Sequence, residues 1–170
     1  ANLFKSVNSD VKVGSSSGFK VIDITLEEKP TGEITAGAGY GTSGSTFIVG
    51  IKENNFNGNG ILLDSNLILT EESIRGKFSY TTPNFAYSDR SLTTSIESTS
   101  TDKEKDYGYK SSLNKILLGT NFEQYENLFV SPNFSISLEE LTTTAKASEN
   151  YKKQEGSYFD ALLSYSITYD

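Results

Sequence analysis

Eight runs of alternating apolar and polar residues follow one another in this chain, and this period-2 pattern limits what it can fold into. Successive side chains of a β-strand point to opposite faces, so each run predicts a strand with one apolar and one polar face. In the first run, the residues that share the apolar face are Ile34, Ala36, Ala38 and Tyr40. The last run does the same with Phe159, Ala161, Leu163, Tyr165, Ile167 and Tyr169. No helical pattern accompanies these runs to cover their apolar faces, so the strands need one common apolar environment.

A closed sheet in a membrane supplies that environment. Apolar residues make up only 35% of the 170 residues, which is little for the core of a soluble β-sandwich. A transmembrane barrel needs only an apolar outer band, because its lumen can be polar. No stretch approaches 18 apolar residues, which excludes a transmembrane helix at the level of the sequence. We therefore predict an all-β fold, an antiparallel eight-stranded transmembrane β-barrel of the outer-membrane type.

Several residue types needed for common active sites are missing. The sequence has no Cys, His, Met or Trp, so it cannot build a thiolate nucleophile, a Ser-His-Asp triad or an ordinary zinc or haem site. We predict no catalytic residues, no metal site, no cofactor and no enzymatic activity. The formal net charge of −7 argues against nucleic acid as a partner, because phosphate binding needs a basic surface.

The chain divides at a linker around Pro30. Residues 1–30 read as a hairpin with strands at 10–13 and 19–27, and residues 31–170 read as the barrel. The expected barrel strands are 32–42, 45–56, 60–70, 73–82, 90–100, 107–118, 127–139 and 157–169. We expect compact joints at 57–60, 82–85 and 119–126, and longer polar loops at 98–106 and 140–156. A bulge near Lys115 would reconcile Tyr109 and Leu113 with Ile116 and Leu118, which lie on the other parity.

Several segments resemble the BamA family, the outer-membrane assembly proteins whose barrels follow periplasmic POTRA domains. The matching segments, in chain order, are residues 3–7 (LFKSV), 21–28 (VIDITLEE), 37–42 (GAGYGT), 55–60 (NFNGNG), 80–85 (YTTPNF) and 163–170 (LSYSITYD). Residues 3–7 look like the end of a POTRA helix, and residues 21–28 are similar to the last POTRA strand. The resemblance implies that residues 1–30 are a periplasmic POTRA-like remnant and that the rest corresponds to the first half of a sixteen-stranded barrel.

The resemblance also implies a function and partners. The chain would lie in the outer membrane of a Gram-negative-type bacterium with its N-terminus in the periplasm, in contact with outer-membrane lipid, client outer-membrane proteins and subunits of the assembly machinery. It would fold and insert clients by strand addition at a weak first strand. The residues of this gate strand would be Glu33, Gly37, Gly39 and Gly41, although glycines there could equally be a device for bending the sheet.

Parity assigns the outer face and leaves alternatives open. We predict that lipid contacts Val49, Phe78, Leu163, Tyr165 and Ile167. Tyrosines near strand ends fit an aromatic girdle, with a sugar-binding platform as the alternative.

The alternatives to an insertase are a passive outer-membrane barrel, an outer-membrane lipid enzyme and a soluble lipocalin-like barrel. For closure we expect a monomer whose first and eighth strands pair, and a dimer of two half-barrels is the competing arrangement.

Overall fold

The computed structural model describes residues 4–16, 18–41 and 44–170, and these separate into two compact units, residues 1–32 and 33–170. The first unit is an antiparallel hairpin of β1 (Phe4–Val13) and β2 (Lys20–Glu28). One face of the hairpin carries Val7, Val11, Ile22, Ile24 and Leu26, all of them exposed. The other face carries two ion pairs, Lys5–Glu27 at 2.7 Å and Lys12–Asp23.

The hairpin corrects one expectation about the N-terminus. Residues Phe4–Val7 lie in β1 and pair with β2, so the expected helix end is wrong for them, and Leu3 lies outside the described residues. Val7 and Val11 alternate with Asn8 and Asp10, which is a strand pattern, and Val7 pairs directly with Leu26. The expected division into a POTRA-like remnant and a barrel stays a prediction.

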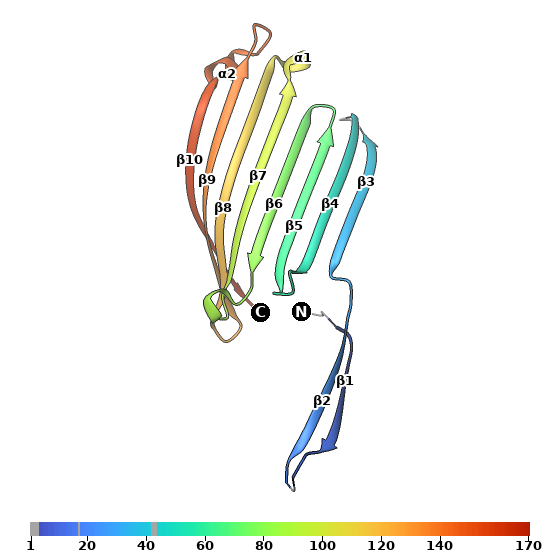
Figure 1. Cartoon of the computed structure of the whole chain (residues 1–170). Helices are drawn as coiled ribbons and strands as arrows, with labels where there is room; N and C mark the ends of the chain where they lie inside the picture. The colour runs from blue at the N-terminus through green and yellow to red at the C-terminus, as the bar shows by residue number, and fades with distance from the viewer. Residues whose placement is uncertain (1–3, 17, 42–43) are drawn as a thin grey trace. The chain divides into compact units, whose positions relative to one another are not determined.

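The second unit is one eight-stranded antiparallel sheet in which every strand neighbours the next one in the chain (Figure 1). Its strands are β3 (Gly32–Gly41), β4 (Gly44–Phe56), β5 (Ile61–Thr70), β6 (Ser73–Thr82), β7 (Ser91–Lys103), β8 (Tyr109–Tyr125), β9 (Leu128–Thr143) and β10 (Gly156–Tyr169). Short elements in the joints are the 3-10 turn η1 (Phe85–Tyr87), α1 (Glu104–Tyr107) and α2 (Glu149–Lys153). The eight predicted strands are thus confirmed, and the antiparallel all-β fold with them.

The longest strands exceed their predicted bounds. β8 continues through residues 119–125, where a compact joint was expected, because Gly119, Phe122 and Tyr125 pair with β9. The joint is reduced to residues 126–127, and Asn127 takes the left-handed conformation with φ of 62° that such a tight turn requires. The pairing of β8 with both neighbours runs unbroken past Lys115, so the expected bulge is also wrong. Leu113 and Ile116 simply face opposite sides.

The sheet is open in this structure. Its order runs from β10 to β3 without a bond between these two strands, so the expected pairing of the first and eighth barrel strands is not observed. The ladders that join β4 to β10 shift register only near strand ends, between Glu53 and Phe56 and between Glu123 and Tyr125. Bulges and glycine kinks are the usual devices for sharp bending, and the middle of these ladders has no bulge.

Candidate functional site

The pairing register sorts the side chains of the sheet onto two faces. Phe78 pairs with Ile96, Ile96 with Ile116, Ile116 with Ile136, and Ile136 with Ala161. Directly paired residues of antiparallel strands lie on the same face. These five side chains therefore form one apolar row across β6 to β10, and we call this side of the sheet the apolar face.

All five residues predicted to contact lipid lie on the apolar face. Phe78 belongs to the row just described, and Val49 pairs with Leu67, which pairs with Gly76 on the same parity as Phe78. On β10, Leu163, Tyr165 and Ile167 share the parity of Ala161. Val49 and Phe78 are each 45% exposed, and the three residues on β10 are 61% to 75% exposed. What this face contacts remains a prediction.

The opposite side, the polar face, carries a row of alternating charge. Lys77 pairs with Glu97, Glu97 with Lys115, Lys115 with Ser137, and Ser137 with Asp160. Opposite charges on neighbouring strands attract, and each contact of this kind contributes a fraction of a kcal/mol, about 0.2–1. The row is typical of a surface in contact with water.

Burial in the sheet is inverted relative to a soluble protein. The serines Ser95 and Ser135 on the polar face are only 8% and 6% exposed, whereas Ile96 and Ile116 on the apolar face are 53% and 57% exposed. A soluble sheet would cover its isoleucines and expose its serines. The polar face is therefore the sheltered side of the curved sheet, and the apolar face is the outer one. An apolar patch of this extent marks a surface that meets another molecule or a membrane.

The predicted gate strand, β3, forms one edge of the sheet. Every residue of β3 is exposed, including Ile34 at 79% and Tyr40 at 85% on the apolar face. A Cβ atom added to Gly37, Gly39 or Gly41 would meet no atom within 4 Å. The strand therefore lacks packing along the half of its length where these glycines lie, and glycine also weakens a strand through its conformational freedom.

The start of β3 borders a polar hollow on the polar face. Glu33 and Thr35 line this hollow of about 220 Å³ together with Lys52, Asp64 and Asn66 from the next two strands. The side-chain amide of Asn66 donates a hydrogen bond to Asp64, with 3.1 Å between Nδ2 and Oδ1. Glu33 thus lies in this polar hollow, apart from the three glycines farther along the strand.

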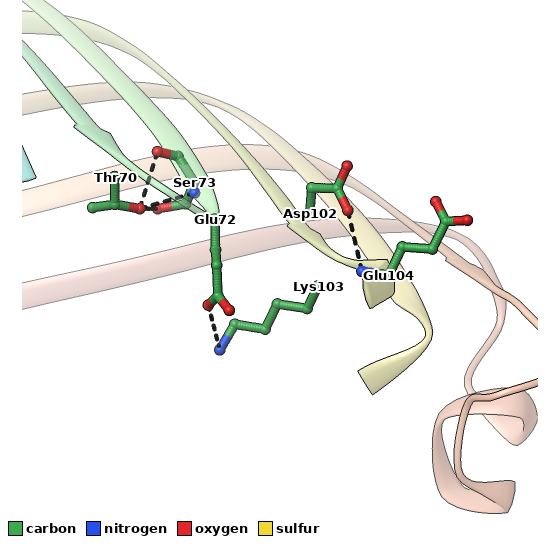
Figure 2. A network of polar contacts seen from close by, with 6 residues as sticks. All are labelled: Thr70, Glu72, Ser73, Asp102, Lys103 and Glu104. Atoms are coloured by element: carbon green, nitrogen blue, oxygen red, sulfur yellow. Dashed lines mark hydrogen bonds and ion pairs between the residues drawn. The ribbon is translucent and has the colours of Figure 1, made fainter. Parts of the chain in front are cut away.

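A network of polar contacts joins strand ends at the rim where β5 and β7 end (Figure 2). The Lys103 ammonium lies 3.3 Å from Glu72 Oε2, and the Ser73 backbone N–H donates to Thr70 Oγ1 at 2.9 Å. Asp102 accepts the backbone N–H of Glu104 at 3.1 Å. On β7 the apolar face becomes polar at Ser98 and Ser100, whereas on β5 and β6 Leu69 and Ile74 keep it apolar up to this rim. The network lies beyond the row that runs from Phe78 to Ala161.

Two neighbours stabilise the charged form of Asp102. The hydrogen bond from the Glu104 backbone N–H lowers the pKa of the Asp102 carboxyl most, and the ammonium of Lys110 adds to the effect. Lys110 also lies 2.7 Å from Glu104 Oε2, and the two carboxylates raise the pKa of its ammonium. The side chains of Asp102, Glu104 and Lys110 are exposed to solvent. Their contacts therefore hold the α1 joint in position but add little to the stability of the fold.

Sequence reasoning missed a second contact at the same rim. The joint after β9 packs on the joint after β7, where the Thr144 N–H donates to the Gly108 carbonyl at 2.8 Å. The rings of Tyr109 and Tyr151 stack with centroids 4.3 Å apart. Gly108 is the one residue whose type gives a hint of this contact in the sequence. A glycine after a polar run often takes the left-handed conformation, and the φ of Gly108 is 74°. Its partner in the next joint is not a property of the local sequence.

The described residues offer neither a metal site nor a membrane-spanning helix. No group of three or more His, Cys, Asp or Glu side chains is placed there to hold a metal ion. Within the same ranges, every helix is too short and too polar to cross a membrane.

Comparison with known proteins identifies the class to which this sheet belongs. The Omp85 superfamily domain matches residues 55–170, and this chain is a member of that superfamily of bacterial outer-membrane β-barrel proteins. No curated protein sequence matches the chain significantly.

The fold is similar to a solved structure of BamA from Haemophilus ducreyi that lacks POTRA domains 1–3. The TM-score is 0.71 at 23% sequence identity, and the match covers 98% of this chain. It covers only 34% of the other chain, so this chain spans about a third of the length of that protein. This likeness confirms the expected BamA-type barrel sheet, and the activity of the whole protein does not transfer with it.

Proposed function

We propose that residues 33–170 form the wall of an outer-membrane barrel that assists the folding and insertion of other outer-membrane proteins through strand addition at β3. The observation that carries this proposal is the free edge: β3 is exposed along its whole length, and three glycines leave half of it without packing. An edge strand offers a row of unpaired backbone N–H and C=O groups to an incoming strand. The proposal includes no covalent chemistry and no cofactor.

The orientation of the sheet supports this proposal. The apolar face would contact lipid, because its isoleucines and aromatic side chains are the most exposed large groups of the sheet. The polar face would line the lumen, where water can solvate Lys77, Glu97 and Lys115.

The hairpin unit would lie in the periplasm as part of a POTRA-like domain. Its support is the apolar face of β1 and β2, with Val7, Val11, Ile22, Ile24 and Leu26, which a larger domain would cover. A hairpin of two strands is marginally stable by itself. Accessory subunits of an assembly machinery would be further partners, as the family resemblance implies.

The test of strand addition is an assembly assay in lipid vesicles. The chain is reconstituted, and the rate at which a urea-unfolded outer-membrane barrel folds into the vesicles is compared with the rate in empty vesicles. We expect acceleration by the native chain and its loss when Gly37, Gly39 and Gly41 are replaced by valine. Valine fits there without a clash, and relative to glycine it stabilises strand structure, by about 0.5–1 kcal/mol at each position.

A matched control is Gly76→Val in β6. Gly76 also has nothing within 4 Å of an added Cβ, but it lies in the interior of the sheet. This variant should keep the acceleration. If the native chain does not accelerate folding at all, the passive barrel is the better description, and if the triple variant is as fast as the native chain, β3 is not the gate.

A further inference from the structure

The joint between β6 and β7 holds Arg90 against the apolar face. The guanidinium carbon of Arg90 lies 5.0 Å from the centroid of the Phe122 ring. Phe122 pairs with Val130, and Val130 pairs with Ile167, so the ring belongs to the apolar face. The backbone carbonyl of Arg90 accepts the N–H of Phe85 at 2.7 Å, and this hydrogen bond closes the joint just before β7 begins.

The charge of Arg90 has no carboxylate partner in the part of the chain that the structure describes. The ion pairs found there involve only lysines, and the neighbouring carboxylate, Asp89, takes part in none of them. At the opposite rim of the same face, Lys110 lies 3.0 Å from Asp102 and 2.7 Å from Glu104. Arg90 is exposed, and an aromatic ring compensates only part of a guanidinium charge, so its N–H donors are available to a ligand.

Arg90 lies where the apolar face ends. On β9, the side chains of this face are uncharged throughout residues 128–138. Ten steps along a strand span about 33 Å, and at a tilt of 35–45° they cover about 25 Å, the height of the apolar band of outer-membrane barrels. Leu128, at one end of this range, pairs with Tyr125, which is 70% exposed, and Phe122 pairs with the next residue of the face. Tyrosines mark the level of the lipid headgroups, so the guanidinium lies at the depth of the lipid phosphates.

We infer that Arg90 and Phe122 form a binding site for the headgroup phosphate of a membrane glycerophospholipid. The guanidinium donates two parallel hydrogen bonds to oxygens of the phosphate, a geometry that arginine can form and lysine cannot. The acyl chains of the same lipid lie along Val130 and Ile167 on the apolar face. The inference rests on the proposed contact of this face with lipid and adds one specific lipid position to it.

The surroundings of Arg90 favour a lipid over a free phosphate ion. A free ion would contact one exposed guanidinium and nothing else, whereas a lipid also covers the apolar side chains next to it. β7 begins at the same rim as β3, because the strands of the sheet alternate in direction (Figure 1). The proposed orientation places that rim on the periplasmic side. The ligand is therefore a phospholipid of the periplasmic leaflet.

Fluorescence quenching by brominated lipids tests the site, because the chain has no native tryptophan. Tyr125→Trp places a single fluorophore on the apolar face, one pair beyond Phe122. The chain is folded into vesicles of digalactosyldiacylglycerol, which has no phosphate, with a small fraction of brominated phosphatidylglycerol or brominated digalactosyldiacylglycerol. The net charge of −7 repels an anionic lipid in general, so enrichment of phosphatidylglycerol at the tryptophan reports a local site. Arg75→Gln is the matched control for Arg90→Gln, since Arg75 pairs with Thr99 on the polar face.

We expect phosphatidylglycerol to be enriched about fivefold over the glycolipid beside the tryptophan, the ratio that one basic residue near an anionic surface supplies. The enrichment should disappear in Arg90→Gln and persist in Arg75→Gln. Quenching by the brominated glycolipid should be the same in all variants, which shows that each remains folded in the bilayer.

Two results overturn the site. The first is enrichment that survives Arg90→Gln, and the second is enrichment that inorganic phosphate removes more effectively than chloride at matched ionic strength, because the site would then bind a free anion. Equal quenching by the two lipids in the native background refutes the phospholipid site and leaves the proposed function standing. If neither lipid quenches the tryptophan, the apolar face does not contact lipid, and the proposed orientation fails together with the inference.

Discussion

Replacing Ile116 or Leu117 by arginine distinguishes the two faces of the sheet at its centre. The two residues are neighbours in β8 and similar in size and hydropathy. Ile116 points to the apolar face between Ile96 and Ile136, and it is 57% exposed. Leu117 points to the polar face between Ser95 and Ser135. If the apolar face contacts lipid, only the first substitution places a charge in hydrocarbon.

The expected magnitudes are well separated. Arginine on the lipid side near the middle of a bilayer costs about 2 to 4 kcal/mol, which corresponds to roughly 30-fold to 700-fold in the folding equilibrium. At position 117 the guanidinium reaches water in the lumen, and its aliphatic stem keeps part of the contact that leucine makes. We expect Leu117→Arg to cost about 1 kcal/mol or less, in line with the tolerance of lumenal positions.

The assay is urea-dependent folding into lipid vesicles, with the folded fraction measured by resistance to protease. Ile116→Val serves as the control for lost volume and should remain close to the native chain. An equal loss of stability in the two arginine variants, or a larger loss at position 117, would refute the assignment of lipid to the apolar face.

Further expectations concern the rim and the hairpin. Gly108→Ala should destabilise the sheet by about 2 to 4 kcal/mol, because a left-handed alanine is strained and its Cβ would lie 2.5 Å from the Ala147 nitrogen. Gly76→Ala, whose Cβ meets nothing, should cause no loss of stability in the same unfolding experiment and a gain of up to about 1 kcal/mol. The lowered pKa of Asp102 means that its contribution to stability is present above the ordinary Asp pKa of about 4 and is lost as pH falls through the lowered value. The protection factors of the α1-joint amides, which correct for the slower intrinsic exchange in acid, should therefore fall on acidification in the native chain and not in Asp102→Asn. A peptide of residues 4–28 should show no cooperative thermal transition by circular dichroism, and a sharp one would contradict the reading of this hairpin as part of a larger domain.

The local pattern of the sequence determined the strands and most of their faces. Alternation in β3, β6 and β10 predicted their bounds to within about one residue, since each pattern depends only on neighbouring positions. The same parity placed Val49, Phe78 and Leu163 on one face before any pairing was known. The lack of histidine and cysteine likewise limited, from composition alone, the kinds of active site and metal site that the chain can build.

The tertiary structure decided what depends on partners distant in the chain. In the run from Ile116 to Leu118 every residue is apolar, so parity was ambiguous there, and only the pairing with β7 and β9 assigned Leu117 to the polar face. The contact between Gly108 and Thr144 joins two separate joints for the same reason. Closure of the sheet depends most strongly on distant partners. Whether β3 meets β10 depends on the total bending of eight strands, and the pattern within any single strand does not determine that bending.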